Sequence, residues 1–248
     1  MKSLALAVLA ASFCLSPAVH ADSISKVNGS IRVTAEDSAG DVSTVNGSIH
    51  IEDGAHVKDV ETVNGSINIG RNSIVDSVET VNGRVSFGEG ARAGAVETVN
   101  GALTFADKVQ VSGAVGTVNG TVRLARDVSV GGDVSNVNGR IALDHAQVGG
   151  GLRTTNGDIE VGAGSRVEGG IQVEKPNFSW FSRNQRAPKI VIGPGAVVEG
   201  ALTFEREVEL YVSDSAKVGR IEGAKPIRFS GDSPSRTERR EAEMQVEK

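Results

Sequence analysis

The sequence predicts an all-β protein: a parallel β-helix of about ten to eleven coils with 18–19 residues in each coil. Three observations support this fold class. An Asn-Gly dipeptide recurs at nearly constant spacing, apolar residues recur in fixed columns around it, and only 4% of the 248 residues are aromatic. A narrow, regular interior filled by β-branched Val and Ile suits this composition better than a broad globular core.

The first 21 residues have the pattern of a secretory leader. Lys2 precedes an apolar run over residues 4–15, and the tripeptide VHA at 19–21 resembles a signal-peptidase site before Asp22. That run is too short to cross a bilayer, and no later segment is suited to it. The single cysteine, Cys14, lies in the leader. We therefore expect an exported bacterial protein, found in the periplasm, at the cell surface or in the medium.

Eight Asn-Gly dipeptides divide residues 22–173 into repeats. Their asparagines are Asn28, Asn46, Asn64, Asn82, Asn100, Asn119, Asn138 and Asn156. Asn-Gly between strands usually indicates a hairpin, but a hairpin meander would not keep the same apolar columns at one fixed interval. The alternative is a coil in which each repeat stacks ~4.8 Å from the last. A left-handed coil of three hexapeptides also takes 18 residues, but it requires small residues where this repeat has Ile. Between the two we expect the right-handed coil, the usual hand of parallel connections.

Apolar residues fill several columns of the repeat. Residues such as Ile49 and Ile51 alternate with polar neighbours, which is the period of a strand. The valine immediately before each asparagine, from Val27 to Val137, forms a further column that we count with the core. One repeat buries too little apolar surface to offset the entropy of ordering it, so coils must stack to fold.

We assign the Asn-Gly pairs a structural role at one corner of the coil. Gly, and to a lesser extent Asn, accepts the left-handed backbone that a corner needs. Stacked asparagines can hydrogen-bond along the axis as an amide ladder. A threonine column two residues earlier predicts a second polar ladder: Thr44, Thr62, Thr80, Thr98, Thr117 and Thr154.

The regular repeat ends at Val173. Residues 174–189 hold a third of the aromatic side chains, and no acid occurs between Lys175 and Val198. We expect a loop inserted at a coil corner, followed by looser coils that complete a β-helix domain over residues 22–229. The polar, highly charged stretch 230–248 is expected to be a disordered tail.

The inserted loop holds the candidate binding residues. Aromatic and arginine side chains concentrate at recognition hot spots, and Trp180 offers a surface on which a sugar ring could stack. In the other interpretation, the aromatic side chains fold back and cover a coil face. The candidates are Phe178, Trp180, Phe181, Arg183 and Arg186.

No residue pattern indicates catalysis, a cofactor or a metal. Glu61, Glu79 and Glu97 occupy one repeat position in three successive coils, and we interpret them as a solvated acidic stripe because no calcium-binding signature accompanies them. The acids are scattered, whereas a polysaccharide hydrolase needs them clustered. A net charge of −5 provides no electrostatic reason to expect nucleic acid as a partner.

Two stretches resemble known bacterial families. The phrases TVNGSI at 44–49 and ETVNGSI at 61–67 resemble a family of β-strand repeats described as adhesins, over about residues 24–173. That family has a largely undetermined function, and the resemblance implies a β-solenoid. The stretch IGPGAVVEG at 192–200 resembles a coil of bactofilins, which are polymer-forming scaffolds. Bactofilins are typically cytoplasmic, so the leader departs from their pattern. Neither family supplies catalytic residues to this chain.

Three functions follow from these expectations. The first is a non-catalytic, adhesin-like binding module of the cell envelope, whose partner is an envelope or host glycan or a protein. The second is a scaffold that assembles end to end, because the end coils of a solenoid carry unpaired strand edges and the first repeat begins just after Asp22. The third and least favoured is an enzyme acting on polysaccharide.

Overall fold

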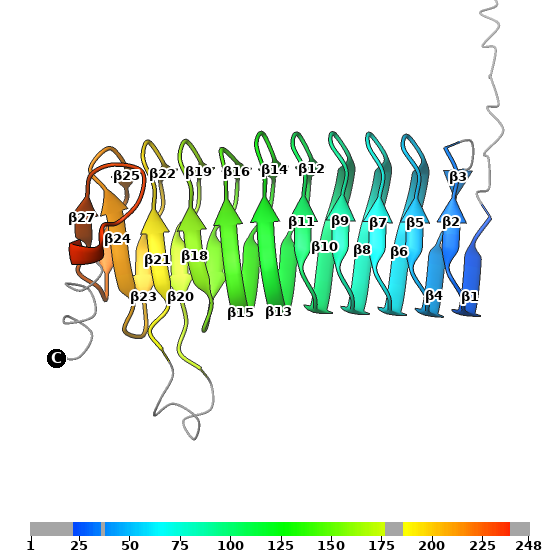
Figure 1. Ribbon diagram of the computed structural model, residues 1–248, viewed down its shortest axis with the longest axis horizontal. Helices are drawn as coiled ribbons and strands as arrows, with labels where there is room; N and C mark the ends of the chain where they lie inside the picture. The colour runs from blue at the N-terminus through cyan, green and yellow to red at the C-terminus, as the bar shows by residue number, and fades with distance from the viewer. Residues whose placement is uncertain (1–21, 36–37, 177–185, 239–248) are drawn as a thin grey trace, which may run out of the picture.

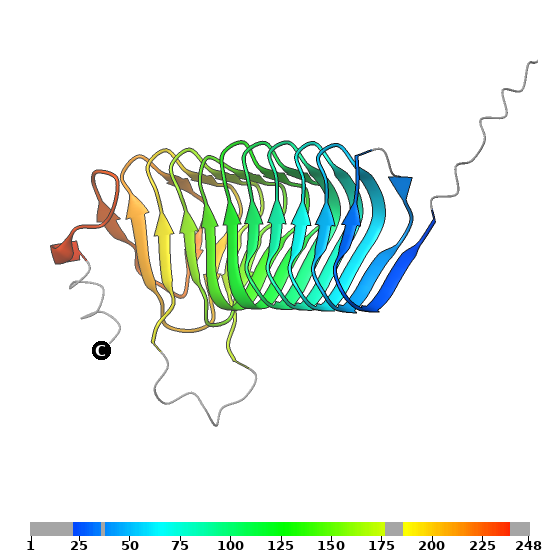
Figure 2. The ribbon, with the colours of Figure 1, turned by 45° about the vertical axis from the view of Figure 1, so that its right-hand side comes forward.

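The computed structural model describes residues 22–35, 38–176 and 186–238. They form a parallel β-solenoid of about eleven turns, which confirms the predicted fold class. The turns stack along one axis, from β1 at one end to β27 at the other (Figure 1). Each turn has three faces, and each face is a continuous parallel sheet along the stack (Figure 2).

The first face ends at the Asn-Gly corner, which we call the asparagine corner. Its strands, in stacking order, are β1 (Ile24–Asn28), β4 (Val42–Asn46), β6 (His56–Asn64), β8 (Ile74–Asn82), β10 (Arg92–Asn100), β13 (Val115–Leu124), β15 (Val134–Leu143), β17 (Leu152–Thr154), β20 (Ile171–Val173), β23 (Leu202–Phe204) and β26 (Ile221–Glu222). Strands pair at identical repeat positions, as between Glu61, Glu79 and Glu97. The 18–19-residue interval in the sequence therefore sets the register directly.

The second face follows the asparagine corner. It consists of β2 (Ile31–Val33), β5 (Ile49–Ile51), β7 (Ile67–Ile69), β9 (Val85–Phe87), β11 (Leu103–Phe105), the second halves of β13 and β15, β18 (Asp158–Val161), β21 (Lys189–Ile192), β24 (Glu209–Ser213) and β27 (Ile227–Phe229). The third face consists of β3 (Ser38–Ala39), the first parts of β6, β8 and β10, β12 (Gln110–Val111), β14 (Ser129–Val130), β16 (Gln147–Val148), β19 (Arg166–Val167), β22 (Val197–Val198) and β25 (Lys217–Val218).

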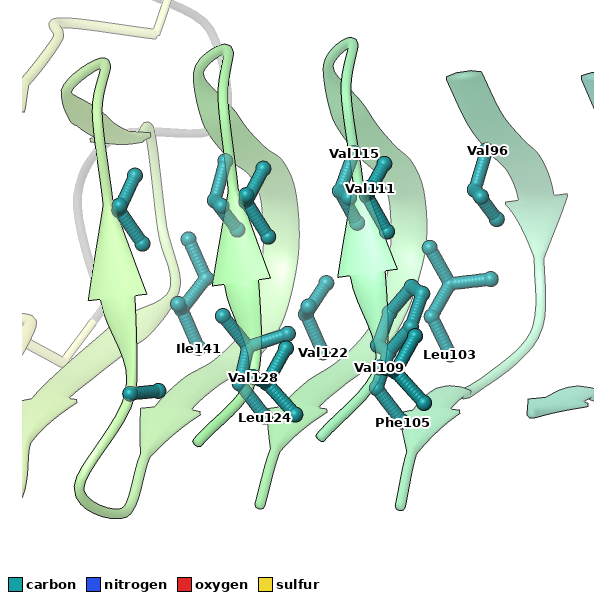
Figure 3. Packing of buried hydrophobic residues seen from close by; sticks show 14 of the residues in the cluster. Val96, Leu103, Phe105, Val109, Val111, Val115, Val122, Leu124, Val128 and Ile141 are labelled. Atoms are coloured by element: carbon teal, nitrogen blue, oxygen red, sulfur yellow. The ribbon is translucent and has the colours of Figure 1, made fainter. Parts of the chain in front are cut away.

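The core is a narrow column of aliphatic side chains with few rings. Leu103, Val122 and Ile141 stack in successive turns and are fully buried, with their side chains pointing into the interior of the coil (Figure 3). Phe87 and Phe105 stack in adjacent turns with ring centroids 4.9 Å apart. The alternating columns of the second face therefore form core, as the sequence predicts.

The valine column before each asparagine was expected to belong to the core, and this expectation was wrong. Val63 is 40% exposed, whereas Val60 on the same strand is fully buried. The reason is the two-residue period of a strand. Val60 and Thr62 point inward, so Glu61 and Val63 must point outward.

The asparagine ladder is present along the asparagine corner. Each side-chain Nδ2 donates to Oδ1 of the preceding asparagine, at 2.8–3.1 Å, through seven bonds from Asn46 to Asn156. The expected left-handed backbone occurs at Gly29 and Gly139 but not at the other glycines of this corner. There glycine is required by close stacking, since a Cβ on Gly83 would lie 1.8 Å from the carbonyl oxygen of Gly65.

A second corner lies between the second and third faces, and sequence analysis did not identify it. Its residues have φ between 50° and 75° in turn after turn. They are Gly54, Asn72, Gly90, Lys108, Asp127, His145, Gly164 and Gly195. Because four different residue types besides glycine share this backbone, no conserved dipeptide marks the corner in the sequence.

The predicted insertion begins at the asparagine corner, where the chain departs from the stack after β20 (Figure 1). Val173 pairs with Thr154 and Ile190 with Ile159, so residues 174–189 stand in place of residues 155–158.

At the far end of the solenoid, residues 236–238 form one helical turn. The backbone N–H of Ser235 donates to the Glu238 carboxylate, and the backbone N–H of Glu238 donates to Ser235 Oγ, so the two residues cap this turn reciprocally. The hydrogen bonds that the Glu238 carboxylate accepts from Ser235 lower its pKa.

Candidate binding groove on the first face

Four of the five predicted binding residues, Phe178, Trp180, Phe181 and Arg183, lie outside the described residues. The fifth, Arg186, donates to both carboxylate oxygens of Asp158 at 2.8 Å. The same carboxylate accepts the backbone N–H of Lys189 at 2.8 Å. Both bonds come from one guanidinium nitrogen, Nη2, and this charge-assisted contact anchors the base of the insertion to the solenoid.

The exposed valines form a straight ridge along the first face. They are Val27, Val45, Val63, Val81, Val99, Val118 and Val137. Six of them are 37–41% exposed, and Val27 in the first turn is 68% exposed. These are the large hydrophobic side chains that the described residues leave exposed. At ~4.8 Å per turn the ridge is about 29 Å long.

A second ridge runs parallel to the valines, two residues earlier on each strand. Its central members are Glu61, Glu79 and Glu97, all exposed and in register with one another. Within the part of the chain that the structure describes, none of the three forms an ion pair. The sequence placed these carboxylates on a stripe, but it did not indicate that an apolar ridge lies beside them.

The two ridges enclose a shallow groove of ≈ 710 Å³, which we call the valine groove. Its floor is the buried threonine column between them. Lys26 lies at one end, Arg153 and Glu174 lie at the other, and none of the lining residues is aromatic. The centre of the groove therefore combines hydrocarbon on one side with negative charge on the other.

The threonines on the floor do not form the ladder that the sequence predicted. The hydroxyls of Thr44, Thr62 and Thr117 donate instead to glycine carbonyls of the preceding turn, at 3.2–3.4 Å. In these three turns the bond gives the buried hydroxyl the partner that it needs. Thr80 and Thr98 have no partner for Oγ1 within the described residues.

Asn136 interrupts the threonine column. It is 4% exposed, and neither atom of its amide has a hydrogen-bond partner in the described structure. It packs beside Gly157, where a Cβ would lie 2.7 Å from its Oδ1. The inward-pointing column beneath the groove thus contains one buried amide where its neighbours, Thr117 and Thr154, carry hydroxyls.

Charged side chains elsewhere on the described surface form ion pairs and small clusters, such as Lys58 with Asp41 and Asp59. Lys108 donates to Glu89 at 2.7 Å. This contact lowers the pKa of Glu89 and raises that of Lys108 through the hydrogen bond and the charge pairing. The described residues contain no group of three or more His, Cys, Asp or Glu that could hold a metal ion.

No helix among the described residues is long and apolar enough to cross a membrane. Comparison with known proteins found no matching family model, no matching curated protein and no matching solved structure.

Proposed function

We propose that the protein is a non-catalytic, adhesin-like binding rod of the bacterial cell envelope, and that its partner lies along the valine groove. The observation that carries the proposal is the ridge of seven exposed valines. Soluble monomers rarely expose contiguous apolar patches above a few hundred Å², and larger ones mark interaction sites. The ridge of valines is continuous over seven turns, and it is where the described residues expose their large hydrophobic side chains.

The environment of the ridge also favours binding. Parallel strand pairing in successive turns holds the residues of both ridges in place. The groove is therefore already ordered, and binding a partner does not cost the entropy of ordering it. The charged pair that the described lining contains, Arg153 with Glu174 at 3.5 Å, lies at one end of the groove and leaves its centre open to a partner. Export through the leader at residues 1–21 would place the rod in the envelope.

The test is site-specific cross-linking in the cell. A photo-reactive amino acid replaces Val81 at the centre of the ridge. In a matched control it replaces Thr104, an outward-pointing β-branched residue of the second face. We expect covalent adducts from position 81 and none from position 104. A folded, exported chain that forms no adduct from position 81 would refute the proposal.

A specific observation favours a second function, a scaffold that assembles end to end. Val27 is 68% exposed, and among the described residues no turn covers the amino-terminal end of the solenoid. Asn28 accepts from Asn46 and donates to no described residue. An uncovered strand edge of this kind can pair with another chain.

Sedimentation velocity on residues 22–248 over a wide concentration range tests the scaffold. End-to-end assembly would produce species that lengthen with concentration and that disappear in Val27→Lys, since charge on an edge strand blocks pairing. A monomer at all concentrations would contradict it. No specific feature of the described residues favours the third function, an enzyme acting on polysaccharide, and we do not propose it.

A further inference from the structure

We infer that the partner of the valine groove is a basic amphipathic helix of another polypeptide, with its apolar stripe on the valines and its Lys or Arg side chains over Glu61, Glu79 and Glu97. This inference rests on the proposed function and specifies its partner. Two properties of the groove lead to it: the charge beside the valine ridge and the spacing along it.

The three glutamates beside the valine ridge carry negative charge that a partner must match. They lie in register in three adjacent turns, and no described cation neutralises them. Like charges stacked at this spacing destabilise one another. A basic partner removes this repulsion and gains charge complementarity, which also steers its approach. Anionic membrane surfaces and nucleic acids carry the wrong charge for this face.

The interval between neighbouring valines fits a helix better than an extended chain. Neighbouring valines along the ridge are ~4.8 Å apart. A helix presents one row of side chains at about 5.4 Å per turn, close to this period. An extended chain presents side chains to one face every ~6.8 Å, and loses register after one or two valines. A helix of about 20 residues covers the ridge at 1.5 Å per residue.

The width of the groove agrees with a helix. The valine and glutamate ridges, represented by Val63 and Glu61, are two residues apart on one strand, which is ~6.8 Å. A helix with side chains is about 10 Å across, so it rests on both ridges at once. Its apolar stripe then faces one ridge and its flanking cations face the other, which is the helix-in-groove mode of recognition.

Two other occupants fit less well. A glycan could hydrogen-bond to the glutamate ridge, but it would leave the hydrocarbon of the valine ridge without an apolar partner, and no lining residue is an aromatic platform for a sugar ring. If a second copy of this chain paired through the same groove, the central glutamates would face a lining whose cations lie at its two ends. These cations are Lys26 and Arg153. Burying carboxylates without a partner charge is costly.

The probe is a labelled peptide of about 20 residues with Leu at helical i, i+3, i+4, i+7 spacing and Lys on the flanks of that stripe. One control peptide has the same composition in alternating order, and another has Glu in place of Lys. Binding to residues 22–248 is followed by fluorescence anisotropy at low and high salt. We expect only the helical basic peptide to bind, and its affinity to fall with salt.

Three variants of the protein locate the site. Glu61→Gln/Glu79→Gln/Glu97→Gln should weaken binding about tenfold or more and flatten the salt dependence, because it removes the facing charge. Val63→Ser/Val81→Ser/Val99→Ser should abolish binding. Asp76→Asn/Glu168→Gln/Glu207→Gln makes the same net charge change at exposed positions outside the groove, and should bind as the unchanged protein does. Circular dichroism and melting temperature verify that each variant is folded.

Equal binding of the alternating or acidic peptide would overturn the inference, as would full affinity of the glutamine variant. Self-association lost in the serine variant would overturn it in favour of a second copy. If no peptide binds while position 81 still forms adducts in the cell, the partner class is wrong and the proposed function stands. If both fail, the proposed function fails as well.

Discussion

The guanidinium of Arg206 donates to Oδ1 of Asn156 at 2.6 Å, and to the backbone carbonyl of Thr155 at 3.2 Å. Asn156 is the last asparagine of the ladder, and its Oδ1 is the one acceptor that no following asparagine can reach. In the next turn Val173 pairs with Thr154, and Arg206 comes from the turn after that, where Phe204 pairs with Val173. Burial lowers the pKa of Arg206 from its ordinary value, but the side chain stays cationic at neutral pH. Arg206 therefore terminates a ladder whose bonds all point the same way.

Replacing Arg206 with Met should destabilise the carboxy-terminal turns. The change leaves Oδ1 of Asn156 and the Thr155 carbonyl without their charged donor, at a cost of about 2 kcal/mol. Urea unfolding followed by circular dichroism measures the loss, and amide exchange over residues 152–160 locates it. Arg206→Lys keeps one charged donor and should recover part of the stability. Equal stability of Met and Lys variants would show that the contact contributes nothing.

The direction of the ladder predicts different effects for the same substitution at its middle and at its end. Asn82 donates to Asn64 and accepts from Asn100, both at 3.0 Å. Aspartate cannot donate, so Asn82→Asp sets two acceptor oxygens against each other and should cost about 1–2 kcal/mol.

Asn28→Asp is the matched control, because Asn28 only accepts, from Asn46 at 3.1 Å. Its carboxylate keeps that bond, and stability should change by less than about 0.5 kcal/mol. Thermal unfolding of both variants at pH 7 compares them. If the two substitutions were equally destabilising, the donor direction of the ladder would be of no consequence.

Close stacking at the asparagine corner predicts that Gly83→Ala is severely destabilising. The added Cβ would lie 1.8 Å from the carbonyl oxygen of Gly65, so the backbone must shift and the ladder must open. We expect a loss above about 3 kcal/mol or an insoluble chain. Gly116 is the control, because a Cβ there lies 3.6 Å from Ser135 Oγ and its φ is not in the left-handed region. Gly116→Ala should be neutral or stabilising by about 0.5 kcal/mol, as measured by urea unfolding.

The unpaired amide of Asn136 predicts a stabilising substitution. Asn136→Thr restores the residue found at this position in neighbouring turns and removes two buried polar atoms that have no described partner. The gain should be about 1–2 kcal/mol in the free energy of unfolding. Thr117→Asn is the reciprocal change. It removes a hydroxyl that donates to Gly101 and should lower stability by a similar amount. A melting temperature that falls in Asn136→Thr would contradict this account.

Sequence reasoning succeeded where a position repeats. Asn46, Asn64 and Asn82 recur every 18 residues, and such an interval can bring identical side chains into register only if each repeat is one turn. The parallel register, the amide ladder and the corner at which the insertion begins all follow from that spacing. The sequence predicted only one side of the candidate groove. The glutamate stripe was identified, but the valines beside it were assigned to the core.

Tertiary structure alone decided which apolar column is buried. Val60 and Val63 have the same side chain and the same strand propensity, and no local property separates them. Val60 is buried and Val63 exposed because Thr62, between them, points inward in the folded turn, so that strand alternation directs Val63 outward.

The contact between Arg206 and Asn156 likewise arises only when the chain is coiled. The residues are 50 apart in sequence, and they meet because the strands that precede them stack through one intervening turn. The repeat by itself determined the architecture, since stacking at a constant period is a property of the sequence. The valine groove and the Arg206 cap depend on which side chains point out of the coil and which turns become neighbours across the insertion, and these are settled only when the coil closes.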